Sequence, residues 1–236
     1  MNTVQPERAR TSSGVPRGFF ITLEGIEGSG KSTHARFLEA AIRDEGYRVF
    51  LTREPGGTPL GEALRTVILG TGDEPPVPEA ELYLILAARA QHVQEVVLPR
   101  LNRGEVVICD RFSDASFAYQ GGGRGLGLDR VARANELATS GLVPDLTLLC
   151  DIPVEEALER VHSRRARGGD YNRFDREKQD FYEAVRAAYL ELARRDPDRI
   201  VTVSSTEAKE QIAERLFEVV APRLRRRRED GGVIAA

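Results

Sequence analysis

Short apolar runs alternate with longer amphipathic segments along most of this chain. Five runs predict strands, at residues 19–23, 49–52, 106–109, 146–150 and 200–203. Helical periodicity appears between them, as in 31–45, where four apolar residues fall on one face. Unbroken apolar strands are buried on both faces, and strands that alternate with helices form parallel sheets. The pattern therefore predicts an α/β fold, with a five-stranded parallel sheet and helices on both faces.

Further helices are expected at 62–69, at 79 to about 98, and in a closing segment that ends near Leu224. Pro99 is expected to end the second of these, because proline lacks the N–H that a helix interior requires. The two ends of the chain lack periodicity. Residues 1–17 predict a disordered leader and residues 225–236 a disordered tail, which leaves 18–224 as one domain.

Composition and charge exclude several classes of protein. The 236 residues are 41% hydrophobic and 30% charged, which is enough for a core, and the net charge is −3. A nucleic-acid partner is disfavoured, because such proteins are usually basic. The longest apolar run, 82–88, is far shorter than the roughly 18 residues of a membrane span, so no membrane partner is expected. The two cysteines lack C-x-x-C spacing, which fits a cytoplasmic location.

Residues 25–32, GIEGSGKS, match the phosphate-binding pattern G-x-x-x-x-G-K-[ST] between a strand and a helix. Glycines let backbone N–H groups face phosphate oxygens, and the helix N-terminus adds positive charge. We expect Lys31 to contact the β- and γ-phosphates of ATP and Ser32 to bind Mg²⁺. The predicted ATP-binding residues are Gly25, Ile26, Glu27, Gly28, Ser29, Gly30, Lys31, Ser32 and Thr33.

Charged residues also follow the neighbouring strands. Asp110 predicts a second contact to Mg²⁺, partly through water, and Arg53 and Arg111 predict contacts to the phosphate of an acceptor. Phosphoryl transfer requires such cations because the phosphates of two nucleotides repel each other. A surface ion pair is the alternative for each arginine. The chain has no Asn-Lys-x-Asp segment to read guanine, which favours a metabolic kinase over a regulatory GTPase.

Four segments together resemble the bacterial thymidylate kinases, a family of P-loop nucleoside monophosphate kinases. They are 24–33, 52–58 (TREPGGT), 110–112 (DRF) and 119–125 (YQGGGRG), and the similarity extends from about residue 18 to 224. The resemblance implies a P-loop kinase fold with a small lid. It implies transfer of the γ-phosphate of ATP to dTMP, giving dTDP and ADP for dTTP biosynthesis, with Mg²⁺ and in a homodimer. The apolar helix around 82–86 is a candidate dimer surface, unless it is covered within one chain.

The resemblance also implies roles for residues of the acceptor site. Glu27 would contact the sugar 3′-hydroxyl of dTMP, and Glu54 would order the acceptor or Mg²⁺. Ile85, where the family usually has an aromatic ring, and Arg89 share a helix face that would meet thymine. The expected dTMP-binding residues are Glu27, Arg53, Glu54, Ile85, Arg89, Arg111, Ser116, Tyr119 and Gln120.

Residues 163–169, SRRARGG, form a basic segment with glycines that is typical of a closing lid, which we place at about 163–174. A solvated basic helix end is the alternative. The family's enzymes that lack an arginine in the phosphate loop carry a catalytic arginine in the lid. The resemblance therefore implies Arg165 or Arg167 beside Lys31 and Arg111 as catalytic residues, with Arg173 as a third candidate.

Two other functions remain open from the sequence. One is a kinase of another small acceptor, although the arginines after the strands favour an acceptor that already carries a phosphate. The other is a P-loop switch or an ATP-dependent partner-binding protein, which would leave the lid unexplained.

Overall fold

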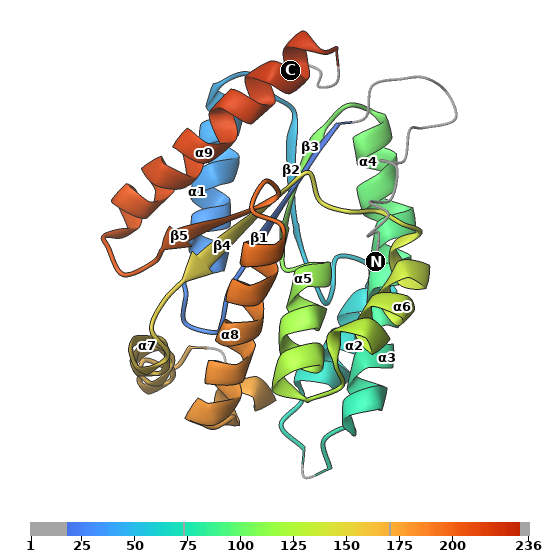
Figure 1. The fold of residues 1–236 in the computed structure, drawn as a ribbon, viewed down its shortest axis with the longest axis vertical. Helices are drawn as coiled ribbons and strands as arrows, with labels where there is room; N and C mark the ends of the chain where they lie inside the picture. Colours follow the sequence, from blue (N-terminus) through green and yellow to red (C-terminus); the bar gives the residue numbers. More distant parts are fainter. Residues whose placement is uncertain (1–17, 73, 170, 232–236) are drawn as a thin grey trace.

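The computed structural model describes residues 18–231 except 73 and 170, so the expected leader and the last five residues lie outside the described part. Five parallel strands form one sheet in the order β2-β3-β1-β4-β5 (Figure 1). They are β1 (Phe19–Glu24), β2 (Val49–Arg53), β3 (Val106–Asp110), β4 (Leu146–Asp151) and β5 (Ile200–Ser204). The predicted sheet is confirmed.

Each strand is one residue longer than its apolar run. Arg53 pairs in register with Asp110, and Asp151 pairs with Ser204, so the backbone ladder continues after the side chains leave the core. These last residues end at the same edge of the sheet, where charged side chains collect.

Helices cover both faces of the sheet (Figure 1). Ile21 and Leu23 of β1 pack with α1 (Lys31–Asp44) and α9 (Lys209–Glu229) in one buried cluster. Phe20, the residue before Ile21, packs on the other face against η1 (Val93–Val97) and α4 (Leu98–Asn102). This alternation follows from the two-residue period of a strand. The remaining helical elements are α2 (Pro59–Leu69), α3 (Pro78–His92), α5 (Ser113–Ser116), η2 (Phe117–Gly123), α6 (Leu128–Thr139), α7 (Val154–Ala166), η3 (Arg173–Arg176) and α8 (Gln179–Arg195).

Pro99 does not end the helix that begins at Pro78, so this prediction was wrong. A π-helical turn, η1, follows α3, and the N–H of Leu98 bonds to the carbonyl of Val93 five residues earlier. Pro99 then lies in the first turn of α4, where its missing N–H costs little.

The tail also begins later than expected, because α9 continues to Glu229. Arginine favours helices, and cations near a helix C-terminus are stabilised by the helix dipole. Leu224 is buried, and the Arg228 guanidinium lies 5.6 Å from the centre of the Tyr47 ring. Within the described residues, none of the helices has the length and apolar character to cross a bilayer.

Candidate active site

A cavity of about 850 Å³ lies at the carboxyl ends of β1, β2 and β3. It brings together sixteen of the predicted site residues from loops and helices far apart in the sequence. Those that line it are Glu27, Gly28, Gly30, Lys31, Ser32, Thr33, Arg53, Glu54, Ile85, Arg89, Asp110, Arg111, Ser116, Tyr119, Gln120 and Arg167. Gly25, Ile26, Ser29 and Arg165 are not among its lining residues. The predicted ATP and acceptor residues therefore share one cavity.

The loop between β1 and α1 has a backbone that requires glycine. Gly28 and Gly30 have φ values of 81° and 83°, a region that residues with a side chain rarely adopt. A Cβ on Gly28 would also lie 2.3 Å from the Ala157 carbonyl oxygen. Helix α1 then begins at Lys31 with no side-chain cap on its first N–H groups. Uncapped N–H groups at a helix start form a site for phosphate.

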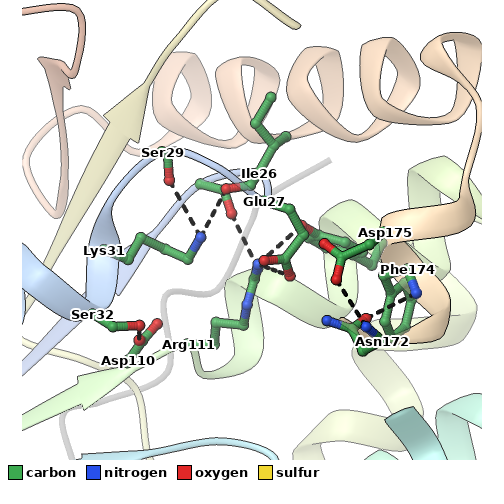
Figure 2. A network of polar contacts seen from close by, with 12 residues as sticks. Ile26, Glu27, Ser29, Lys31, Ser32, Asp110, Arg111, Asn172, Phe174 and Asp175 are labelled. Atoms are coloured by element: carbon green, nitrogen blue, oxygen red, sulfur yellow. Dashed lines mark hydrogen bonds and ion pairs between the residues drawn. The ribbon is translucent and has the colours of Figure 1, made fainter. Parts of the chain in front are cut away.

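Lys31 and Ser32 are placed by short polar contacts (Figure 2). The Lys31 ammonium donates to the Ile26 carbonyl at 2.8 Å and to the Ser29 hydroxyl at 3.2 Å. Burial and the charge of Arg111 lower the pKa of Lys31 from its usual value. The Ser32 hydroxyl donates to the Asp110 carboxylate at 2.5 Å. A hydroxyl beside a carboxylate at the cavity wall is an oxygen donor set that suits Mg²⁺.

Arg111 and Glu27, which both line the cavity, form an ion pair, as Figure 2 shows. The Nη2 of Arg111 lies 2.8 Å from Oε1 of Glu27 and also donates to the Tyr119 hydroxyl at 3.0 Å, while Nη1 donates to the Gly25 carbonyl at 3.0 Å. Burial opposes the ionisation of Glu27, yet Arg111, Lys31 and Arg164 lower its pKa to about 2. Glu27 is therefore a carboxylate at neutral pH.

Arg89 is almost completely buried in a second polar cluster. Its guanidinium donates to Oε2 of Glu54 at 2.7 Å, to Oδ1 of Asn135 at 2.6 Å, to the Ser116 hydroxyl at 3.0 Å and to the Phe112 carbonyl at 2.9 Å. These contacts use four of the five guanidinium N–H bonds and leave one on Nη2. The arrangement brings together Glu54, Arg89 and Ser116, which were all predicted for the acceptor site. Asn135 was missed, because it lies 46 positions from Arg89 in the chain and no local pattern links them.

The two remaining polar acceptor residues, Arg53 and Gln120, each contact a glutamate of the chain. Arg53 forms an ion pair with Glu62 at 2.9 Å, and both side chains are about half exposed. The surface ion pair considered as the alternative for Arg53 is thus present, although Arg53 also lines the cavity. Gln120 donates to buried Glu81 at 2.5 Å.

The lid arginines differ in their placement. Arg165 stacks on Tyr171, 4.1 Å from the ring centre, and Arg173 pairs with Glu81 at 2.7 Å. Neither lines the cavity, whereas Arg164 and Arg167 do. The assignment of Arg165 is therefore corrected: helix α7 turns this residue away from the cavity.

Arg160, Arg164 and Arg167 share the cavity-facing side of α7 and its end. Their spacing of four and three residues places them on one helix face. The sequence contained this signal, but residues 163–169 were interpreted as a lid and not as the end of a helix, so the face shared by Arg160 and Arg164 was missed. Arg164 also pairs with Asp175 at 2.8 Å.

The cavity is strongly basic although the chain carries a net charge of −3. Ten basic residues line it, against four acidic ones. The basic residues are Lys31, Arg36, Arg53, Arg65, Arg89, Arg111, Arg160, Arg164, Arg167 and Lys209, and the acidic ones are Glu27, Glu54, Asp110 and Glu207. A cleft with one dominant sign of charge concentrates ligands of the opposite sign, here polyphosphates.

The family model described as "Thymidylate kinase" matches residues 23–216, which include every residue that lines the cavity. The chain belongs to the thymidylate kinase family. It is 50% identical over 195 residues to the thymidylate kinase of Pseudomonas putida strain GB-1, covering 83% of this chain and 91% of that protein. It is 52% identical over 188 residues to the thymidylate kinase of Pseudomonas fluorescens strain Pf0-1, covering 80% and 88%.

Membership of the thymidylate kinase family confirms the resemblance carried by the four segments and the P-loop kinase fold expected with it. It disfavours the alternative of a P-loop switch or a partner-binding protein.

Proposed function

We propose that this chain transfers the γ-phosphate of ATP to dTMP, giving dTDP and ADP on the route to dTTP. The observation that carries this function is the single basic cavity in which the uncapped start of α1 meets the Arg111–Glu27 pair and the Arg89 cluster. The start of α1 supplies a site for the phosphates of ATP. The Arg111–Glu27 pair and the Arg89 cluster supply a site for a second phosphate ester that carries a base.

On the ATP side, the α1 N–H groups and Lys31 bind the β- and γ-phosphates. Ser32 and Asp110 would hold Mg²⁺, which neutralises phosphate charge when it is bound. Arg164 and Arg167 reach the cavity from α7 and stabilise the charge on the phosphoryl group during transfer. In this assignment Arg164 takes the place that the sequence analysis gave to Arg165.

On the acceptor side, Arg111 binds the phosphate of dTMP and Glu27 accepts a hydrogen bond from the sugar 3′-hydroxyl. All four Nη hydrogens of Arg111 already have acceptors among the described residues. A phosphate oxygen must therefore replace one of these acceptors or use Nε. Arg53 adds a second positive charge beside the dTMP phosphate once it exchanges its contact with Glu62 for one with the phosphate.

Ile85 and Arg89 form the base site, with Ser116, Tyr119 and Gln120 around it. A guanidinium can only donate hydrogen bonds, so the remaining N–H of Arg89 suits the C4 carbonyl of thymine and opposes the C4 amino group of cytosine. Glu54 orients Arg89 through their 2.7 Å ion pair. We also propose that the enzyme is a cytoplasmic homodimer.

Release of ADP in the presence of a panel of acceptors tests this function. We expect the highest kcat/KM for dTMP, a value about 10–200-fold lower for dUMP, which lacks one methyl group, and a still lower value for dCMP. Thymidine, without a phosphate, should give no stimulation. An Arg89→Met variant should narrow the gap between dTMP and dCMP. Preference for dCMP, or no stimulation by any acceptor, would overturn the proposal.

A further inference from the structure

Arg111 is connected through Tyr189 to a carboxylate that the site described above does not use. The Nη1 of Arg111 donates to the Tyr189 hydroxyl at 3.3 Å, and this hydroxyl donates to Oε2 of Glu24 at 2.7 Å. A tyrosine hydroxyl has one hydrogen to donate, so its hydrogen goes to Glu24 while its oxygen accepts from Arg111. The three groups form one directed chain of hydrogen bonds, from Arg111 to Glu24.

The other oxygen of Glu24 binds the backbone of the same turn. Oε1 accepts the N–H of Phe112 at 2.7 Å, and the carbonyl of Leu23 accepts the N–H of Arg111 at 3.0 Å. Arg111 has a φ of 70°, in the left-handed region that residues other than glycine seldom adopt. The end of β1 therefore fixes both the backbone and the guanidinium of Arg111.

We propose that Glu24 is a positioning residue for phosphoryl transfer, which aims Arg111 at the acceptor phosphate through Tyr189 and the Phe112 N–H. This inference rests on the proposed role of Arg111. It adds a residue that touches neither substrate but decides where the phosphate-binding guanidinium lies.

The surroundings of Glu24 make this function dependent on pH. Burial and then the charge of Asp114 raise the pKa of Glu24, while Arg111 and the hydrogen bonds from Tyr189 and Phe112 lower it, and together they place it at about 7. The groups that face it are Asp114 from α5, Arg111 from the loop after β3, Tyr119 from η2, Tyr189 from α8, and the thiols of Cys109 (β3) and Cys150 (β4). Asp114 is paired with Arg199 at 2.6 Å, and burial raises the pKa of both thiols, of Cys150 to about 11. Glu24 therefore has its pKa near neutral pH.

Protonation of Glu24 would break the chain. Both of its oxygens face donors, so an added proton places a donor against either Phe112 N–H or Tyr189 O–H. If the Tyr189 hydroxyl turned away, its hydrogen would face the Arg111 N–H instead. Arg111 is correctly held only when Glu24 is ionised, and activity should rise as the pH passes through about 7.

Glu24→Gln tests the proposal, because the amide places an N–H donor in this site at every pH. At pH 8 we expect kcat/KM for dTMP to be about tenfold below wild type, and at pH 6 the two proteins should differ by less than about threefold. Substrate phosphates titrate near pH 6 with either protein, so the ratio of the two proteins is the quantity to follow. The melting temperature of Glu24→Gln should also rise relative to wild type between pH 5 and 8, since only wild type acquires the buried charge.

Tyr189→Phe provides a second variant should Glu24→Gln fail to fold. It removes the link to Arg111 and keeps the contact between Glu24 and Phe112, so KM for dTMP at pH 8 should rise about three- to tenfold. Asp145→Asn is a matched control, because its Oδ2 accepts the Phe20 N–H at 2.8 Å at the opposite end of β1. This control should keep wild-type kinetics at every pH.

The inference would be overturned if the ratio of kcat/KM for dTMP between Glu24→Gln and wild type did not change with pH. A wild-type KM for dTMP in Tyr189→Phe would overturn it as well. Arg111→Lys separates it from the proposed function. Wild-type kinetics in Arg111→Lys would refute the role of Arg111 itself. An impaired Arg111→Lys beside normal Glu24→Gln and Tyr189→Phe would refute the inference alone.

Discussion

At the residue scale, Lys31 contacts the phosphate loop and also stands at the start of helix α1. Its ammonium donates to the carbonyl of Ile26 and the hydroxyl of Ser29, so it closes the phosphate loop over the cavity. Lys31 is also the first residue of α1, whose N-terminus is the proposed phosphate site. A change at Lys31 should therefore affect transfer much more than folding, since the loop backbone is set by its glycines.

Lys31→Ala should lower kcat/KM about a thousandfold, which corresponds to a loss of roughly 4 kcal/mol of transition-state stabilisation. Steady-state kinetics and a melting curve measure the two effects separately. Lys178→Ala removes an exposed lysine at the start of α8 and should leave both unchanged. Turnover close to that of wild type in a folded Lys31→Ala protein would contradict the assignment of residues 25–32 as the phosphate-binding loop.

At the element scale, helix α7 presents its arginines in two directions. Arg164 and Arg167 line the cavity, and Arg165, one position after Arg164, stacks on Tyr171 instead. Successive residues of a helix are about 100° apart, so neighbouring side chains cannot share a face. The face of the helix thus decides which arginines line the cavity.

Arg164→Ala and Arg167→Ala should each lower kcat much more than they raise KM for dTMP, because these residues act on the phosphoryl group during transfer. Arg165→Ala should have a distinctly smaller effect. Kinetics of the three single variants at saturating ATP give the comparison. If Arg165→Ala shows the largest loss of kcat, the proposed orientation of α7 during transfer is wrong.

The sequence predicts contacts within one element better than contacts between elements that are far apart in the chain. Ile85 and Arg89 were correctly placed on one face, because helical periodicity is local. The Arg111–Glu27 pair joins residues 84 positions apart and the Arg89–Glu54 pair joins residues 35 apart, so each depends on how strands are ordered in the sheet. Pro99 was misjudged because a π turn changes the hydrogen-bond register before it, and the apolar pattern carries no trace of that turn.

At the scale of the whole molecule, three neighbouring helices leave large apolar side chains exposed. Tyr83 of α3 is 65% exposed, Val67 of α2 58% and Leu137 of α6 86%. Helix α3 packs against both α2 and α6, and Figure 1 shows the three together beside the sheet. Of the residues that the sequence suggested for a dimer contact, Leu82, Ile85 and Leu86 are buried within the chain and Leu84 is partly buried. The surface of α3 that remains for a partner is the one that carries Tyr83.

The proposed homodimer should therefore depend on Tyr83. Tyr83→Glu places a charge on this surface, and an unpaired charge that becomes buried in an apolar contact is strongly unfavourable. We expect the dimer dissociation constant to rise at least about tenfold, a cost of about 1.4 kcal/mol. Sedimentation velocity over a range of protein concentrations measures this change. Phe37→Glu alters an apolar residue, 42% exposed, on α1 at the other face of the sheet and should leave the association unchanged. If Tyr83→Glu associates as wild type does while Phe37→Glu dissociates, the contact lies on the α1 side of the sheet. If the wild-type protein is a monomer at every concentration, the homodimer proposal fails.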